Sequence, residues 1–360
     1  MELSPFPHQG PLSPEQVRGR DELVADLIER ATARRVTAVL GPRRFGKTSV
    51  LRKVESILEE ASTSTIWLDL YAATSYADLV VRFDTALAAT RGSFRQRVDS
   101  LAASASLNLG MLRVEFSKPP AKRPDPEASL HLLLDVLVSA ATSSPTVVII
   151  DEFQGLTGVQ GAAGLLRTKL QHHVQDIGLL FAGSEPSVMA SMFSDREQPF
   201  YGQADLVEIE PFSLVALQSI IAEGFSSTGR DAAGLAGQIH EFTQGHPYRS
   251  MQIADEAWRL SPTDEPTLPE RWADTLENIR RSTTSGLEAL FTSFSGAERV
   301  VLRSRASDRP LFGASLKLYG VSSGAMTAAR DRLVEQGTLT NDHEIVDPLL
   351  ADWVQRRFPL

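Results

Sequence analysis

Short apolar runs alternate with longer segments of helical periodicity over the first part of this 360-residue chain, up to Pro211. Between the runs, apolar residues recur every three or four positions, as on one face of an amphipathic helix. Runs that are apolar and β-branched throughout are typical of parallel strands covered on both faces. The alternation predicts an α/β domain with a five-stranded parallel sheet. The expected strands are residues 35–40, 65–71, 146–151, 178–184 and 206–209.

The segment after the first expected strand is rich in glycine and basic residues, and it fits the pattern G-x-x-x-x-G-K-[ST] of a phosphate-binding loop, or P-loop. Gly41 and Gly46 allow a tight turn whose N–H groups point at phosphate oxygens. Lys47 can reach the β- and γ-phosphates, and the Thr48 hydroxyl can bind Mg²⁺. A glycine turn with a solvent-facing lysine is the structural alternative. The expected nucleotide contacts are Gly41, Pro42, Arg43, Arg44, Phe45, Gly46, Lys47, Thr48 and Ser49.

Two carboxylates stand at the end of the third expected strand, where ligands bind in open α/β sheets. We expect Asp151 to hold Mg²⁺ together with Thr48, and Glu152 to orient or deprotonate the attacking water. Ser184, at the polar end of the next strand, could sense the γ-phosphate, although a satisfied loop serine fits it nearly as well. A solvated strand end is the alternative for the carboxylate pair. The expected catalytic set is Lys47, Asp151, Glu152 and Ser184.

Composition shifts divide the chain into four parts. Residues 1–16 carry four prolines and should form an extended N-terminal arm. Residues 17–211 form the expected ATPase core, with a Ser-, Ala- and Pro-rich insertion at about 91–126. Leu109 and the run 111–116 suggest an extra strand in that insertion. The part from 212 to 294 is helical in pattern and is expected to form a lid, with a linker at 261–266.

The last part, residues 295–360, has the element order of a winged helix-turn-helix. Helices are expected at 297–305, 313–318 and 322–335, then two strands around Asn341-Asp342, and a closing helix at 347–354. This part carries nine Lys or Arg and eight Asp or Glu, a net charge of +1, against −10 for the remainder. That asymmetry is small beside the dense basic face of a strong DNA binder. The candidate DNA contacts are Lys317, Arg330 and Arg332, for which a solvated helix face is the alternative.

The composition of the chain restricts its expected cellular location and its partners. The chain has no cysteine, which excludes disulfides and thiolate metal sites and fits a reducing cytoplasm. The start lacks the basic-then-apolar pattern of a signal peptide, and no apolar run approaches transmembrane length, so we expect a cytoplasmic protein without a membrane partner. The net charge of −9 argues against non-specific nucleic-acid binding.

With these motifs assembled, the chain resembles the archaeal-type ATPases of the STAND and AAA+ P-loop classes, relatives of the origin-recognition initiators. The resemblance spans nearly the whole chain. The P-loop and the Asp-Glu pair are shared by ATPases generally, and the Gly-His-Pro-Tyr and Asp-Pro…Trp segments narrow the match. The segments that carry it are 17–23 (Val-Arg-Gly-Arg-Asp-Glu-Leu), 41–49, 150–154 (Ile-Asp-Glu-Phe-Gln), 183–184 (Gly-Ser), 199–202 (Pro-Phe-Tyr-Gly), 245–248 (Gly-His-Pro-Tyr) and 347–353 (Asp-Pro-Leu-Leu-Ala-Asp-Trp).

The resemblance implies ATP and Mg²⁺ as cofactors, an ATPase core, a helical lid and a C-terminal winged helix. It also implies which residues flank adenine and ribose. Relatives often carry an arginine where this chain has Gln203, which leaves a trans-acting arginine at that point in doubt. Arg196, Arg43 or Arg44 could substitute, and a solvated arginine is the alternative for each. The residues carried over to the adenine and ribose site are Val17, Arg18, Gly19, Arg20, His246 and Pro247.

Three functions are compatible with these motifs. The first is an ATP-dependent switch with slow hydrolysis, whose winged helix contacts duplex DNA or a partner. The second is a nucleotide-binding signalling or scaffold protein whose winged helix contacts proteins only, and self-association fits either. The third, a kinase-like phosphotransferase, is disfavoured because Glu152 beside Asp151 suits the activation of water.

Overall fold

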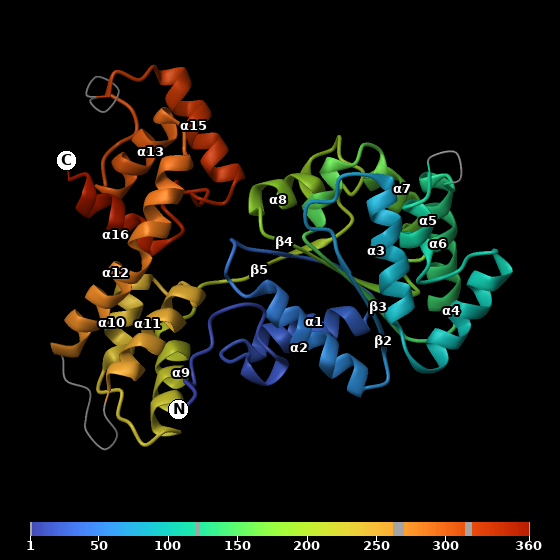
Figure 1. Cartoon of the computed structure of the whole chain (residues 1–360), viewed down its shortest axis with the longest axis horizontal. Coiled ribbons are helices and arrows are strands. Elements are labelled where there is room, and N and C mark those ends of the chain that lie inside the picture. Colours follow the sequence, from blue (N-terminus) through green and yellow to red (C-terminus); the bar gives the residue numbers. More distant parts are fainter. Residues whose placement is uncertain (1, 120–122, 262–269, 314–318, 360) are drawn as a thin grey trace. The chain divides into compact units, whose positions relative to one another are not determined.

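The structure, a computed structural model, describes residues 2–119, 123–261, 270–313 and 319–359 (Figure 1). The chain divides into two compact units. We call them the sheet unit, Arg20–Gly41 and Lys47–Ile209, and the helical unit, Met1–Gly19, Pro42–Gly46 and Glu210–Leu360. Within the described ranges, no helix combines the length and the apolar character that crossing a membrane requires.

The sheet unit contains the predicted five-stranded parallel sheet, with strand order β2-β3-β4-β1-β5. The register aligns the strand ends that matter for chemistry. Asp69 of β2 pairs with Asp151 of β3, and Leu40 of β1 pairs with Gly183 of β4. The segments that follow β1, β3 and β4 therefore leave the same edge of the sheet. The strands are β1 Val36–Leu40, β2 Ser64–Asp69, β3 Thr146–Asp151, β4 Ile177–Gly183 and β5 Asp205–Glu208.

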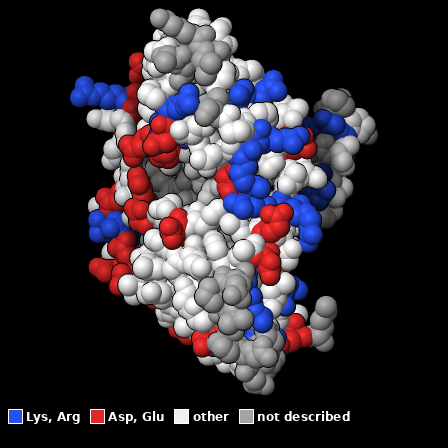
Figure 2. Space-filling model, turned by 90° about the vertical axis from the view of Figure 1, so that its left-hand side faces the viewer, with Lys and Arg blue, Asp and Glu red and all other residues white. Residues whose placement is uncertain are grey.

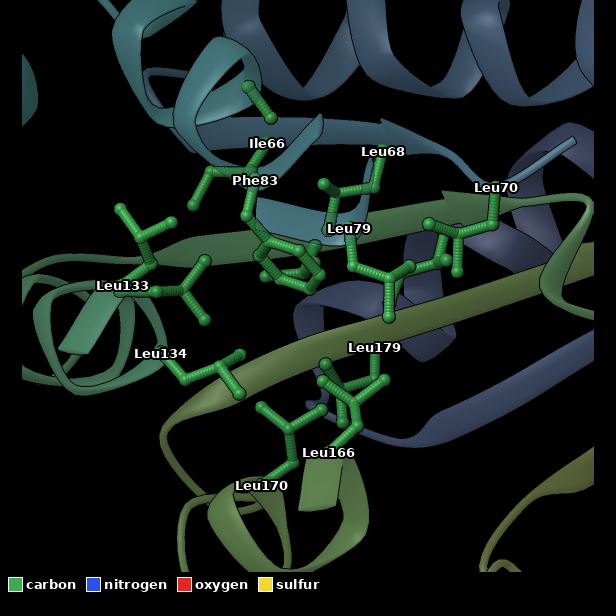
Figure 3. Close-up of a cluster of buried hydrophobic side chains, with 14 of the residues drawn as sticks. Ile66, Leu68, Leu70, Leu79, Phe83, Leu133, Leu134, Leu166, Leu170 and Leu179 are labelled. Atoms are coloured by element: carbon green, nitrogen blue, oxygen red, sulfur yellow. The ribbon is translucent and has the colours of Figure 1, made fainter. Parts of the chain in front are cut away.

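The main core of the sheet unit lies between the sheet and helices α3 (Tyr76–Ala89), α6 (Pro126–Ala141) and α7 (Ala162–Leu170). Their apolar faces turn inward because leucines recur at helical spacing. Figure 3 shows these side chains converging on those of β2 and β4. The residues labelled there are Ile66, Leu68, Leu70, Leu79, Phe83, Leu133, Leu134, Leu166, Leu170 and Leu179, each of them buried.

Helices α1 (Asp21–Thr32) and α2 (Lys47–Glu60) lie on the side of the sheet away from α3, α6 and α7 (Figure 1). Their inward residues are buried, among them Leu27 and Leu51 with no exposed surface. Burial on both faces explains why the central strands read as continuous apolar runs. Helix α8 (Pro186–Ser194) follows β4.

The insertion is helical, so the predicted extra strand is wrong. Residues 92–104 form α4, and Leu112–Phe116 form the short helix α5. A buried carboxylate explains the turn before α5, because Asp84 accepts hydrogen bonds from the backbone N–H groups of Gly110, at 2.7 Å, and Leu112, at 3.3 Å. Burial raises the pKa of Asp84 above its ordinary value, and these two hydrogen bonds oppose that rise.

The helical unit is built around a second apolar core, to which the N-terminal arm contributes. The Phe6 side chain is 1% exposed, and its ring centroid lies 5.5 Å from that of Phe225. Residues 14–16 form a short 3-10 helix, η1 (Pro14–Gln16), and the predicted linker at 261–266 lies almost entirely outside the described residues. The helices from residue 214 onward are α9 Leu214–Ser226, α10 Leu235–Thr243, α11 Pro247–Leu260 and α12 Glu270–Ser293.

The C-terminal part contains α13 (Gly296–Ala306), α15 (Ser323–Glu335) and α16 (Pro348–Arg357), close to three of the predicted helices. Most of the helix predicted at 313–318 lies outside the described residues. The predicted pair of strands is reduced to one antiparallel bridge, Leu339↔Ile345, which closes a turn over Asn341-Asp342. The turn is tight: Thr340 N–H donates to the Glu344 carbonyl at 2.8 Å.

Candidate functional site

The P-loop joins the end of β1 to the start of α2, as its motif requires. Gly46 has φ +89°, a conformation that residues with a side chain rarely adopt, and a Cβ on Gly41 would lie only 2.1 Å from Ile209. The buried Lys47 ammonium donates to the Gly41 carbonyl at 2.6 Å. The cation therefore lies across the loop, where a phosphate would be held.

The two residues predicted to bind Mg²⁺ are in direct contact. Thr48 Oγ1 donates to Asp151 Oδ2 at 2.7 Å, although 103 positions separate the two residues in the sequence. Burial raises the pKa of Asp151, and the neighbouring charges of Glu152 and Asp69 raise it further, against the hydrogen bond from Thr48. A carboxylate disfavoured in this way is stabilised by a bound cation, so the pair fits a divalent metal.

Glu152 follows Asp151 with φ 51° and ψ 44°, a left-handed conformation that is strained for a residue with a side chain. Such strain clusters at functional sites. Ser184 Oγ donates to Glu152 Oε2 at 2.7 Å, so the structure brings together two of the predicted catalytic residues. The Gln154 amide donates to the same oxygen.

Sequence reasoning did not assign a role to Gln154, the second residue of the short 3-10 helix η3 (Phe153–Gly158). The available signal was its place two positions after Glu152, inside a segment already quoted for the family. A buried amide cannot be told from an exposed one by sequence position alone.

The tip of the P-loop, Pro42–Gly46, belongs to the helical unit. There the buried ring of Phe45 meets that of His246 edge-on, with centroids 4.9 Å apart. The Arg44 guanidinium lies 4.7 Å from the centroid of the Tyr248 ring, a cation–π arrangement. The loop and the predicted Gly-His-Pro-Tyr turn are thus neighbours.

Phe212 links the other segment predicted to flank the nucleotide to the same turn. Its N–H donates to the Gly245 carbonyl at 2.8 Å, and its ring lies beside Gly19. Val17 is buried in the helical unit, and Arg18 forms an exposed ion pair with Glu223, at 3.5 Å. Arg20 precedes α1 in the sheet unit. Ser49 is buried in the first turn of α2.

Burial controls the charge of His246. It lowers the pKa of His246 to about 4, so the ring is neutral at pH 7. In that form Nδ1 accepts a hydrogen bond from Arg249 N–H at 3.4 Å and caps α11, which has Pro247 in its first turn. A neutral ring can pack against Phe45 without leaving a buried charge.

The remaining predicted residues that the structure describes lie at the surface. Arg196, proposed as a substitute for a trans-acting arginine, is exposed, as are Arg43 and Arg44. Arg330 of α15 pairs with its neighbour Asp331 at 2.6 Å, and Arg332 pairs with Glu298 of α13 at 3.2 Å. Lys317 lies outside the described residues.

A parallel sheet of this order, a glycine loop between its first strand and first helix, and a carboxylate touching the loop threonine define a P-loop nucleoside triphosphatase. The chain belongs to the family described as the ATPase domain predominantly from Archaea, whose model matches residues 21–252. It is therefore an ATPase, and the predicted family is confirmed.

Three solved structures are similar to this chain, and the first of them shares its fold. A Walker-type ATPase of Pyrococcus abyssi is 20% identical with a TM-score of 0.68, and the match covers 98% of this chain and 99% of that one. The ORC1 protein of Aeropyrum pernix, solved in complex with DNA, is 12% identical with a TM-score of 0.47, over 94% and 93% of the two chains. A RuvB of Thermotoga maritima is 14% identical with a TM-score of 0.47, over 99% of each chain. No curated protein matches the chain.

Proposed function

We propose that this ATPase is a Mg·ATP-dependent switch that hydrolyses ATP slowly. The observation that carries the proposal is the 2.7 Å contact between Thr48 Oγ1 and Asp151 Oδ2, which pairs the two expected Mg²⁺ ligands. In this proposal Lys47 neutralises the β- and γ-phosphates, and Glu152 takes a proton from the attacking water. Ser184 then senses the γ-phosphate.

The helical unit supplies the switch in this proposal. Phe45 is part of the P-loop itself, so a phosphate that reshapes the loop changes the packing of Phe45 on His246. His246 caps α11, and Arg249 of that helix binds Asp347 at the start of α16. A chain of contacts thus leads from the loop to the C-terminal helix, which supports coupling between nucleotide state and the C-terminal part. Val17–Arg20, His246 and Pro247 are proposed to flank adenine and ribose.

The proposed domains are a core at 17–211, a helical lid at 212–294 and a winged helix at 295–360. The winged helix is proposed to contact DNA or a partner, through α15. Figure 2 shows Lys and Arg side chains beside Asp and Glu side chains on the face that it draws. A cytoplasmic location fits this function.

A second candidate, a switch whose C-terminal part contacts only proteins, is favoured by one observation. The two described DNA candidates, Arg330 and Arg332, each pair with a carboxylate of the same chain. Binding of either arginine to a phosphate would have to replace that pair.

Hydrolysis tests the first proposal. Lys47→Ala should lose tight Mg·ATP binding, and Glu152→Gln should keep binding but lose most of the hydrolysis, since an amide cannot accept a proton. Activity should disappear with a chelator and return with Mg²⁺. Wild-type affinity in the first variant, or a wild-type rate in the second, would refute the corresponding assignment.

A further inference from the structure

The carboxylate of Glu152 is held through one of its oxygens by two neutral donors. Ser184 Oγ donates to Oε2 at 2.7 Å, and Nε2 of Gln154 donates to the same atom. Nε2 also lies 3.4 Å from Ser184 Oγ, so the three side chains form a closed triangle within the sheet unit. Oε2 is thus fixed, and the carboxylate can rotate little about its long axis.

Gln154 is a polar side chain in an apolar setting. It is 8% exposed, and its neighbours Phe153 and Leu156 are core residues. Its Oε1 is shielded from solvent and has no hydrogen-bond partner among the described residues. Reversing the amide would set Oε1 against the carboxylate of Glu152, which is also an acceptor, so the observed orientation is the one that chemistry favours. An unsatisfied buried carbonyl costs free energy, so stability does not explain the residue.

Gly183 provides the space for this amide. A Cβ at Gly183 would lie 2.4 Å from Oε1 of Gln154 and 2.4 Å from Met189 Sδ. Since real Cβ atoms essentially never approach so closely, even alanine would displace the glutamine or the methionine. Gly183, the last residue of β4, and Gln154, the second residue of η3, therefore pack so closely that only a glycine fits beside the amide.

The backbone on both sides of Glu152 is anchored. Asp151 closes β3, and the ring of Phe153 packs 4.3 Å from that of Phe181, centroid to centroid. Only the side chain of Glu152 is then free to rotate, and its hydrogen bonds with Gln154 and Ser184 restrain that rotation.

We propose that Gln154 is a positioning residue that holds Glu152 for attack of water on ATP while Ser184 turns to the γ-phosphate. This inference rests on the proposed function of Glu152. A serine hydroxyl has one proton and cannot donate to Glu152 and to a phosphate at once. When Ser184 turns its proton to the γ-phosphate, the amide of Gln154 remains on the carboxylate.

The step balances as a hydrolysis. Glu152 takes one proton from water, the water oxygen bonds to the γ-phosphorus, and the bond from that phosphorus to the β–γ bridging oxygen breaks. ADP and phosphate leave, and Glu152 returns its proton to solvent. Gln154 exchanges no proton and needs no contact with ATP, so its loss should lower the rate without weakening nucleotide binding.

Two variants of similar shape test the positioning role of Gln154. Gln154→Met keeps the length and removes the donor, so kcat should fall by roughly tenfold to a hundredfold, as for loss of other outer-shell partners. Gln154→Glu replaces the donor with an acceptor, and kcat should fall further. Gln154→Met should bind a non-hydrolysable ATP analogue with the wild-type Kd and keep the wild-type melting temperature, whereas Gln154→Glu, which sets a second buried carboxylate against Glu152, should melt lower. Gln175→Met, on the surface, is the matched control and should behave as the wild type.

A double-variant cycle separates positioning from packing. In the Glu152→Gln background, Gln154→Met should cause no further loss, because it acts through that carboxylate. An unchanged kcat in Gln154→Met, an additive loss in the double variant, or a joint fall of kcat, affinity and melting temperature would overturn the inference. A wild type without hydrolysis would overturn both this inference and the proposed function. A defect in Glu152→Gln but not in Gln154→Met would overturn this inference alone.

Discussion

Arg249 and Asp347 form a two-point ion pair between residues that lie 98 positions apart in the sequence. Arg249 Nε donates to Oδ1 at 2.9 Å, and Nη2 donates to Oδ2 at 2.5 Å. The arginine side chain is 5% exposed and the aspartate side chain 21%. Burial alone would raise the pKa of Asp347. The hydrogen bonds and the charge of Arg249 outweigh burial and hold that pKa below its ordinary value. Asp347 also caps α16 by accepting from Leu349 N–H at 3.0 Å.

Removing this aspartate should be costly. Asp347→Ala takes away a helix cap and leaves the buried Arg249 guanidinium without a carboxylate partner, so we expect the free energy of unfolding to fall by about 3 kcal/mol. Urea unfolding at pH 7 measures it. Asp331→Ala, which breaks the exposed pair with Arg330, should cost less than about 1 kcal/mol. Equal losses in the two variants would contradict the prediction.

The buried His246 makes stability depend on pH. The unfolded chain binds a proton at this residue below about pH 6.5, whereas burial keeps the folded residue neutral down to about pH 4. The stabilisation from neutral His246 is therefore present above pH 6.5 and lost as pH falls toward 4. The stability gap between the wild type and His246→Asn should narrow by roughly 2 kcal/mol from pH 7 to pH 5.

Urea unfolding of both proteins at the two pH values measures that gap. Comparison with a variant cancels the other titrating groups, which the two chains share. His172→Asn, at an exposed position, should follow the wild type at both pH values. A gap that stays constant between pH 7 and pH 5 would show that burial of His246 does not control its protonation.

Asp151 should destabilise the nucleotide-free protein. Since burial raises its pKa, stability linked to this group is present at low pH and lost as pH rises through the folded pKa. Asp151→Asn should therefore raise the melting temperature in a chelator by a few degrees, or about 1 kcal/mol. The same variant should lose most of the further stabilisation by Mg·ATP.

Asp69→Asn is the matched control for that experiment. Asp69 ends the neighbouring strand in register with Asp151 but is exposed. Asp69→Asn removes the smallest of the contributions that raise the pKa of Asp151, so it should raise the melting temperature in a chelator less than Asp151→Asn does, and it should keep the stabilisation by Mg·ATP. If Asp151→Asn melts below the wild type in the chelator, the carboxylate is structural.

Local patterns predicted the parts of the site that local sequence determines. The P-loop, Asp151 and Glu152 at and just after the end of β3, and Ser184 just after β4 follow from runs of a few residues. Their meeting followed from the rule that ligands gather at the carboxyl ends of parallel strands.

Contacts between distant positions that no motif links escaped prediction. The run 111–116 has strand-like residues, but its fold is decided by the buried carboxylate of Asp84, a tertiary contact. The pair of Arg249 with Asp347, the burial of Phe6 and the amide of Gln154 on Glu152 likewise depend on packing that no window of sequence contains. The hairpin after α15 closes through a single bridge, so it lacks the ladder that its pattern suggested.

The ion pairs of Arg330 and Arg332 limit the affinity that we predict for DNA. Phosphate contacts by Arg330 and Arg332 require their pairs with Asp331 and Glu298 to open, so affinity should be weak. We expect binding of duplex DNA at low salt that is lost at physiological salt. The logarithmic salt slope should be about 2, since each phosphate contact adds roughly 0.9. Titration at both salt concentrations, with ATP and without, measures it.

Arg330→Ala combined with Arg332→Ala should remove this binding, because both phosphate contacts come from α15. Arg356→Ala combined with Arg357→Ala removes the same charge from α16 and should leave most of the DNA binding. This control separates contacts made by α15 from an effect of the protein's net charge. Lys317, outside the described residues, would add one further contact to the slope. If neither nucleotide state binds at low salt, or if both double variants bind alike, α15 is not a DNA-reading helix. The proposal that the C-terminal part contacts only proteins would then replace it, since Asp331 and Glu298 already occupy the arginines that DNA would need.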